Sequence, residues 1–338
     1  MVNAQDVIKL AIDSRHRCGA ASKYSQKDSQ DALREALIEL NGGSTKFNMK
    51  TMRSGQGAEI FSIVEEVIQQ ELNDYWTNNE LVNRICEYRN LALGDQQGFY
   101  VPEDSLFAVA SISEGNTRMR RQRYEGGRYF DVPTELRGIK VFEDMTRVMA
   151  GRVDFNDMID RAIRSFAKDS YERIMLAWNS IDASVLGETY VPNVTGTYDE
   201  STLLNLIAHV EAETNQTAVI YGTKVALRNL APSIDMAASS AKDDLYNLGY
   251  FGKFYGTDCV VMQQTHKLNS ADFLLDDKTV YVMASDERPI KYITEGESMI
   301  LQKEPTQNAD LTYEWLYTER TGVAVVANKK FGKYTFAR

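Results

Sequence analysis

The longest helical pattern in the sequence runs from Phe155 to about Asn179. Apolar residues recur there every three or four positions, which gives the helix one apolar face. Asp154 is expected to cap its N-terminus, and Asp157 lies in the first turn, where the helix dipole favours negative charge. At 1.5 Å per residue the helix would be roughly 35–40 Å long. A strut of this length constrains the whole fold, because the other elements must be arranged along it. The residues expected to form its buried spine are Phe155, Ile159, Ile163, Phe166 and Trp178.

The residues before this helix predict a helical start and then an extended hairpin. Helices are expected around residues 7–11 and over residues 31–40, 59–72 and 81–93, with a connector at 42–58. Strand-like patterns at 106–112 and 129–132 flank a polar, arginine-rich segment. The segment has too few apolar residues to bury itself, so such a hairpin needs a surface on which to lie.

Five arginines lie on this hairpin: Arg118, Arg120, Arg121, Arg123 and Arg128. They are open to three interpretations: a solvated tip, a nucleic-acid arm, or an element that docks on acidic residues of a neighbouring subunit. The net charge of −10 argues against a general nucleic-acid binder, and Tyr124 is the one aromatic residue near the run. We therefore favour the docking interpretation and expect these arginines to make an inter-subunit contact.

The residues after the long helix alternate between helices and strands, so the chain is predicted to be an α+β protein. Asp199 should cap a helix that ends near residue 213, and further helices are expected at 224–230 and 241–248. The remaining segments are strand-like and are bounded by a predicted turn at 305–310. Strands are expected at 218–221, 259–262, 280–283, 299–302, 311–317 and 323–326.

No motif for catalysis or for cofactor binding occurs in the sequence. It has no phosphate-binding P-loop, no H-E-x-x-H zinc motif and no G-x-S-x-G nucleophile motif. Its cysteines (Cys18, Cys86, Cys259) and its histidines (His16, His209, His266) are widely separated, which does not favour a metal site or a disulfide framework. No window approaches the roughly 18 apolar residues of a membrane helix. We therefore expect no enzyme, no catalytic or metal-binding residue, no cofactor and no membrane partner.

The order of these parts resembles the Hong Kong 97-type major capsid proteins of tailed bacteriophages. The most similar stretches are 141–145, 151–155 leading into the long helix with Asp160, 219–223 leading into a helix, and 319–326 followed by Lys330-Phe331. The similarity covers residues 96–338. It implies an N-terminal arm, an extended hairpin called the E-loop, a spine helix, peripheral β strands and an α/β axial domain.

The resemblance also implies how the chain is divided. The expected segments are a helical N-terminal arm (1–95), the E-loop and its connection (96–150), and the spine helix of a peripheral domain (151–195). An axial domain (196–298), peripheral-domain strands (299–322) and a return to the axial domain (323–338) should follow.

The implied function is that of a major capsid protein. Such a subunit assembles with itself into hexamers and pentamers of an icosahedral shell that encloses double-stranded DNA without sequence-specific binding. It would be made in the cytoplasm of the host bacterium and be found in the virion, with scaffold, portal and decoration proteins as further partners. Two alternatives remain open: an encapsulin-like nanocompartment shell, and an α/β enzyme with its site in residues 196–300.

Overall fold

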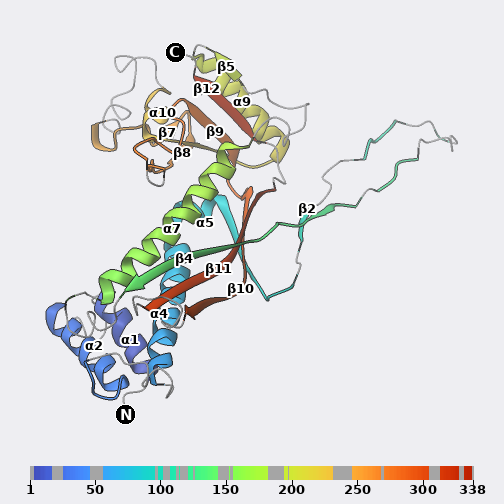
Figure 1. Ribbon diagram of the computed structural model, residues 1–338. Helices are drawn as coiled ribbons and strands as arrows, with labels where there is room; N and C mark the ends of the chain where they lie inside the picture. Colours follow the sequence, from blue (N-terminus) through green and yellow to red (C-terminus); the bar gives the residue numbers. More distant parts are fainter. Residues whose placement is uncertain are drawn as a thin grey trace.

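The computed structural model of the 338-residue chain is elongated, with the N-terminus and the C-terminus at opposite ends (Figure 1). N-terminal helices form one end, a six-stranded sheet with helices forms the other, and a single long helix runs between them (Figure 1). The structure describes residues 4–16, 26–45, 56–95, 98–101, 107–111, 114, 121–124, 126–143, 152, 155–181, 194–196, 198–230, 246–267, 270–303, 313–326 and 331–336.

The N-terminal end is a group of helices packed on one another. They are α1 (Ala4–His16), α2 (Gln26–Leu40) and α4 (Gln56–Asn78), whereas the short α5 (Glu80–Ile85) that follows them packs in the core beneath the six-stranded sheet. Each of the first three places an apolar stripe toward the others, and the buried residues of this core include Val7, Leu37 and Ile63. The expected helices in residues 7–11, 31–40 and 59–72 are therefore confirmed.

The middle of the molecule is a four-stranded sheet in the order β1-β10-β11-β4. The strands are β1 (Cys86–Leu91), β4 (Glu135–Glu143), β10 (Ile290–Lys303) and β11 (Tyr313–Val325). β1 runs parallel to β10, whereas β10 with β11 and β11 with β4 are antiparallel. Residues from near both ends of the chain therefore meet in one sheet.

The sheet at the C-terminal end has six strands in the order β5-β12-β9-β6-β8-β7. They are β5 (Val194–Gly196), β6 (Ala218–Gly222), β7 (Lys253–Phe254), β8 (Thr257–Val261), β9 (Thr279–Ala284) and β12 (Gly332–Phe336). Helices α9 (Glu200–Thr214) and α10 (Lys224–Arg228) pack on this sheet, and the Asp199 side chain caps α9 as expected. The central strands β6 and β9 are buried at every residue.

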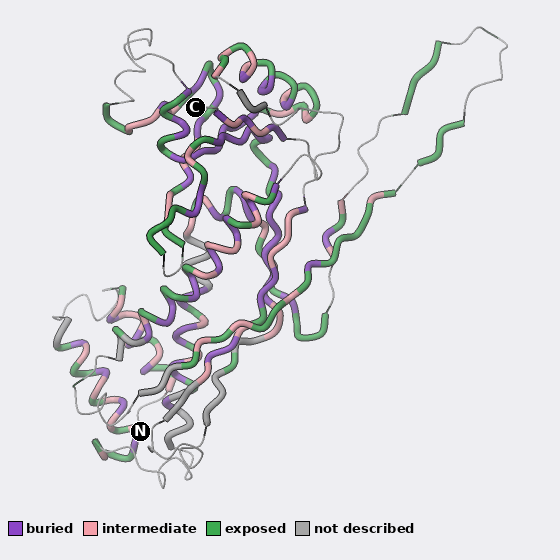
Figure 2. Tube along the Cα trace, turned by 45° about the horizontal axis from the view of Figure 1, so that its top comes forward, coloured by how far each residue is buried: buried purple, intermediate pink, exposed green. Residues whose placement is uncertain are grey.

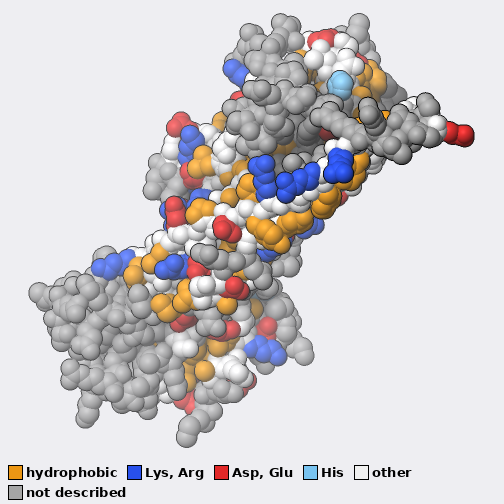
Figure 3. Space-filling model, turned by 90° about the vertical axis from the view of Figure 1, so that its right-hand side faces the viewer, with side chains coloured by type: hydrophobic (Ala, Val, Ile, Leu, Met, Phe, Trp, Pro, Cys, Tyr) orange, Lys and Arg blue, Asp and Glu red, His pale blue; other side chains and the backbone are white. Residues whose placement is uncertain are grey.

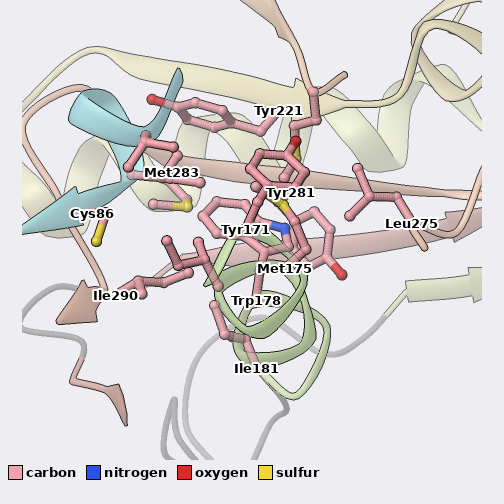
Figure 4. Packing of buried hydrophobic residues seen from close by; sticks show 14 of the residues in the cluster. Cys86, Tyr171, Met175, Trp178, Ile181, Tyr221, Leu275, Tyr281, Met283 and Ile290 are labelled. Carbon is pink, nitrogen blue, oxygen red and sulfur yellow. The ribbon is translucent and has the colours of Figure 1, made fainter. Parts of the chain in front are cut away.

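The long helix α7 (Phe155–Asn179) has the predicted bounds and joins two hydrophobic cores. Its first half packs into the core of the N-terminal helices, where Phe166 meets Tyr317 of β11 edge to face at 4.8 Å. Its second half packs under the six-stranded sheet, where Trp178 is fully buried against Tyr221 and Tyr281 (Figure 4).

The predictions are wrong in type or extent in three regions of the chain. The helix expected at 81–93 ends at Ile85, and the chain continues as strand β1 because Cys86–Leu91 pairs along its whole length with β10. The separate strands at 299–302, 311–317 and 323–326 belong to the two longer strands β10 and β11. The polar residues Thr318 and Thr321 lie within β11 and are buried there, so they do not mark a break.

The third error concerns the hairpin. Residues 107–111 are extended but form no strand, and the paired strands lie nearer its base: β2 (Phe99–Val101) with β3 (Arg128–Phe130). The proposed cap Asp154, the turn at 305–310 and most of the helix expected at 241–248 fall outside the described residues.

Candidate functional site: the E-loop and its base

We use the name E-loop for residues 98–132, whose described parts extend away from the rest of the molecule (Figure 1). The two arms are joined near the base by the pairing of β2 with β3. Farther out, the Gln122 side chain joins the two arms by hydrogen bonds of the kind that paired strands make with their backbones. Its Nε2 donates to the Ala108 carbonyl and its Oε1 accepts from the Ala108 N–H, both at 2.7 Å. Side-chain bonds of this kind hold two arms together without a continuous strand.

In the single subunit, most described residues in the outer part of the E-loop are exposed (Figure 2), and they include apolar and basic residues. All three residues of β3 are exposed, and the Tyr129 ring packs on Tyr100 of the opposite arm, with ring centroids 5.1 Å apart. Tyr124 is 74% exposed and Val109 is 98% exposed. Figure 3 views the molecule from the right-hand side of Figure 1, and on that face a row of basic side chains lies next to apolar ones.

Three of the five predicted arginines lie in the described part of the E-loop. Arg121, Arg123 and Arg128 are exposed and make no ion pair with any described residue, whereas Arg118 and Arg120 fall outside the described residues. The structure thus leaves the described arginines available for a partner. Sequence reasoning missed the aromatic pair Tyr100 and Tyr129 at the start of the two arms, because only the fold brings these two residues together.

The base of the E-loop, in contrast, is anchored to the four-stranded sheet. Phe99 and Val132 are buried against Leu91 and Ile293 in a small apolar cluster. The Arg89 guanidinium lies over the Phe99 ring, 4.1 Å from its centroid, a favourable cation–π geometry. The E-loop therefore leaves a fixed point on the sheet.

Charged residues on the same face reinforce this anchor. The Lys291 ammonium donates to Glu87 at 2.7 Å, and the Arg89 guanidinium donates to the same carboxylate at 2.7 Å. Burial alone would raise the pKa of the Glu87 carboxyl, but the hydrogen bonds from Lys291 and Arg89 outweigh it, so this pKa is lowered.

Glu295 of β10 is a second carboxylate near this base, and it binds the chain segments that enter and leave the E-loop. It accepts hydrogen bonds from the Thr134 hydroxyl at 2.5 Å and from the Gly94 N–H at 3.1 Å. These bonds favour the ionised form and lower the pKa of Glu295. Gly94 has a φ of +83°, a conformation that glycine adopts without steric cost.

Four of the five residues expected to form the spine lie among the residues whose burial the structure describes. Ile159, Ile163, Phe166 and Trp178 are buried on the face of α7 that packs on the two cores. Phe155 is the first residue of α7, and its side chain falls outside the described ones. These residues lie on α7 and hold the subunit together through its two cores.

The described residues also bear on the alternative of an enzyme site. No group of three or more His, Cys, Asp or Glu residues in the described ranges is placed to hold a metal ion. Burial raises the pKa of the Cys86 and Cys259 thiols to about 12, so both stay protonated and are poor nucleophiles. One pocket lies against Arg15, His16 and Glu71, and only Val261 and Gln263 of its lining come from the segment 196–300.

Within the described ranges, no helix is both long and apolar enough to cross a membrane.

Comparison with known proteins gives the family. The sequence matches, over residues 9–335, the family described as "SPbeta prophage-derived putative capsid protein YonB". The chain belongs to this capsid protein family. The match spans both sheets, the spine helix and the E-loop, so it covers every part of the fold described above. No curated protein sequence matches this chain.

Three solved capsid structures are similar to this chain. The mature capsid of bacteriophage PhiM1 is 10% identical, with a TM-score of 0.50, and the alignment covers 77% of this chain and 88% of that one. The capsid of the Helicobacter pylori bacteriophage KHP30 is 11% identical, covering 76% and 91%, with a TM-score of 0.47. The procapsid of satellite phage P4 is 8% identical, covering 80% and 90%, with a TM-score of 0.48. At such identities the likeness establishes the fold, and the expected α+β capsid fold is confirmed by the PhiM1 structure.

Proposed function

We propose that this chain is the major capsid protein of a tailed bacteriophage or prophage. In this proposal it assembles into hexamers and pentamers of an icosahedral shell that encloses double-stranded DNA, and it performs no catalytic step. The observation that carries the proposal is the capsid family match over residues 9–335. The family supports neither an encapsulin-like shell nor an α/β enzyme. Assembly would take place in the cytoplasm of the host bacterium, with scaffold, portal and decoration proteins as further partners.

The division of labour along the chain is also a proposal. Residues 1–95 would form the N-terminal arm, 96–150 the E-loop and its connection, and 151–195 the spine. Residues 196–298 would form the axial domain, 299–322 the peripheral strands and 323–338 the return to the axial domain. The placement of β12 beside β9 in the six-stranded sheet supports the last of these segments.

Particle size tests the proposed function directly. Full-length protein expressed alone or with its neighbouring genes should elute as capsomers or shells and appear as closed particles in negative-stain micrographs. Particles from infected or induced cells should contain nuclease-protected double-stranded DNA. A small soluble oligomer under all of these conditions would contradict the proposal.

We further propose that the E-loop tip binds an acidic surface of an adjacent subunit through Arg118, Arg120, Arg121, Arg123 and Arg128. Arginine pairs with carboxylates through two parallel hydrogen bonds, and the chain has 48 acidic residues against 38 basic ones. Each partly exposed pair contributes only about 0.2–1 kcal/mol. A shell repeats the contact in every subunit, so several weak pairs per subunit together decide whether the lattice forms.

Charge reversal at the tip tests this contact. Replacing Arg120, Arg121 and Arg123 together by Glu should leave the subunit folded by circular dichroism and abolish shells. A control variant with Arg152, Arg164 and Arg228 replaced by Glu changes the net charge equally at exposed sites outside the E-loop, and it should assemble better. Wild-type assembly should also weaken as salt rises, since such pairs are screened. Normal shells from the tip variant would leave the solvated-tip interpretation.

A further inference from the structure

The face of the four-stranded sheet that packs against α7 contains a carboxyl group without a counter-charge. Glu319 of β11 is partly buried and makes no hydrogen bond or ion pair with any described residue. Side chains alternate along a strand, so Glu319 points to the same face as Tyr317 and Thr321. Tyr317 meets Phe166 of α7, and Thr321 accepts a hydrogen bond from Arg173 of α7 at 2.6 Å. Glu319 therefore lies between two contacts that hold the helix on the sheet.

The backbone around Glu319 is irregular. In the pairing of β10 with β11, Glu295 is opposite Arg320 and Met299 is opposite Thr318, so three residues of β10 bulge out opposite Glu319 alone. The bulge begins at Gly296, whose φ of +75° is a conformation that L side chains rarely adopt. Bulges bend a strand and locally interrupt its ladder. Glu319 thus occupies the point at which this sheet bends.

The groups that face Glu319 come from four elements. β1 and β10 contribute Tyr88 and Tyr292, which are stacked 5.9 Å apart, and the Tyr292 hydroxyl donates to Ser170 of α7. β4 contributes Glu135 and, directly opposite Glu319 in register, Arg137. α7 contributes Arg173, with Asp169 beside it at the edge of the same helix face. The charged members of this set are Glu135, Arg137, Asp169 and Arg173.

Both nearby arginines already interact with another carboxylate, that of Glu135. Arg137 pairs with Glu135 at 3.2 Å, and Arg173 lies 3.8 Å from the same carboxylate. The Arg137 Nε is nevertheless buried without a hydrogen-bond partner. Glu135 is 65% exposed, so its side chain is able to move into water and release a guanidinium. An ionised Glu319 would compete with Glu135 for these cations, whereas a neutral Glu319 would not.

We propose that Glu319 is a proton-operated latch between the spine helix and the bent sheet. In its neutral form the carboxyl group lets α7 pack over the bulge with Arg173 bound to Thr321 and near Glu135. In its ionised form it draws Arg173 or Arg137 toward itself, breaks the Arg173–Thr321 bond and loosens the centre of α7 on the sheet. The only reaction is the transfer of one proton between the carboxyl group and water.

The direction of the effect follows from the environment of the group. Burial raises the pKa of the Glu319 carboxyl to about 7. Since the folded protein holds the proton more tightly than the unfolded chain, the packed form is fully stabilised below a pH of about 4.5 and loses this contribution as pH rises through about 7. The latch thus responds across the range near neutrality.

Hydrogen–deuterium exchange of the full-length chain tests the latch in a single assembly state. After correction for intrinsic exchange, protection of residues 166–178 should fall by about tenfold to a hundredfold between pH 5.5 and pH 8.0. Glu319→Gln should keep the high protection at both pH values. Asp258→Asn is the matched control, because Asp258 is an exposed carboxylate of β8 outside the contact between α7 and the four-stranded sheet, so this variant should retain the wild-type response.

A second measurement covers the case in which Glu319→Gln does not fold. The side-chain carbon of Glu319 in wild-type protein, followed by nuclear magnetic resonance, should titrate near pH 7, and Arg173→Met should move that midpoint to higher pH. Titration at an ordinary glutamate value, or the same pH response in wild type and Glu319→Gln, would overturn the latch. The outcome is independent of whether shells form.

Discussion

The six-stranded sheet and the E-loop use strands in opposite ways. Every residue of β6 and β9 is buried within the subunit, whereas every residue of β3 is exposed. Both regions contain aromatic residues, so composition does not distinguish them. The difference is what covers them: α7, α9 and α10 cover the sheet, but nothing in the described subunit covers the outer E-loop. Exposed apolar patches of this kind are typical of surfaces that are buried in a complex.

This difference shows which side chains stabilise the folded subunit and which remain exposed for contacts between subunits. Folding of the subunit depends on the cores along α7, because those side chains lose their contact with water when the single chain folds. The outer E-loop buries little surface when the single chain folds. Its apolar and basic residues therefore remain available to stabilise contacts between subunits. Variants in the two regions should therefore separate folding from assembly.

The largest effect is expected from Phe166→Asp in the middle of α7. Phe166 is buried against Tyr317, and an aspartate there would be an unpaired carboxylate in an apolar core, which costs several kcal/mol. We expect loss of soluble subunit, measured as the soluble fraction after expression. Phe166→Leu is the control and should remain soluble, since such an apolar replacement costs far less. Normal yield of Phe166→Asp would show that folding does not depend on this core.

Trp178→Ala should have the next largest effect. The indole is fully buried and meets Tyr221 and Tyr281 edge to face at 5.7 and 5.1 Å (Figure 4). Removing it leaves a cavity, and such truncations cost about 3–5 kcal/mol. Denaturant unfolding should report a loss in this range, and Trp178→Phe should lose less. A loss below about 1 kcal/mol would mean that the six-stranded sheet does not depend on the helix beneath it.

Helices with one uninterrupted apolar face were predictable from the sequence. The bounds of α7 and the capping of α9 by Asp199 follow from local spacing and local hydrogen bonds alone. Strand β1 was not predictable in this way, because Leu81, Ile85 and Tyr88 also fit a helical pattern. The strand exists because β10, some 200 residues later in the chain, pairs with it.

The candidate site likewise has one part that was predictable from the sequence and one part that was not. The arginines of the E-loop were found from composition, since a run of like charges is visible in the sequence. The anchor at its base was not found, because Phe99, Arg89 and Lys291 come from three separate segments that only the fold brings together. Glu319 was likewise invisible, because a glutamate between polar neighbours is ordinarily solvated.

Phe99→Ala tests the boundary between the two regions. Phe99 belongs to a cluster of only four buried residues, so its truncation should cost about 3 kcal/mol, the low end for such a change. We expect faster proteolysis within residues 98–132, while the unfolding of the six-stranded sheet is unchanged. Limited proteolysis followed by mass spectrometry measures both. Equal destabilisation of the whole subunit would mean that the E-loop and the sheet fold as one unit.

The smallest effect on the subunit, and the clearest separation of folding from assembly, is expected from Tyr129→Ser. Tyr129 is 74% exposed and its ring packs on Tyr100, which is also exposed, so its loss should change the free energy of unfolding by no more than about 0.5 kcal/mol. Aromatic side chains are nevertheless enriched at protein interfaces, where they contribute large apolar areas. Shell yield should therefore fall although stability does not.

The matched control for this variant is Tyr246→Ser, which removes an equally exposed tyrosine (83%) outside the E-loop. If both variants assemble normally, apolar contacts of the E-loop are dispensable and its arginines alone must hold the neighbour. If Tyr129→Ser loses shells and Tyr246→Ser keeps them, the interface combines an apolar contact with ion pairs. The two cases also differ in salt dependence: ion pairs are screened by salt, whereas apolar contacts are not weakened by it. Assembly of Tyr129→Ser should therefore be more sensitive to salt than that of wild type, because the remaining contacts are charged.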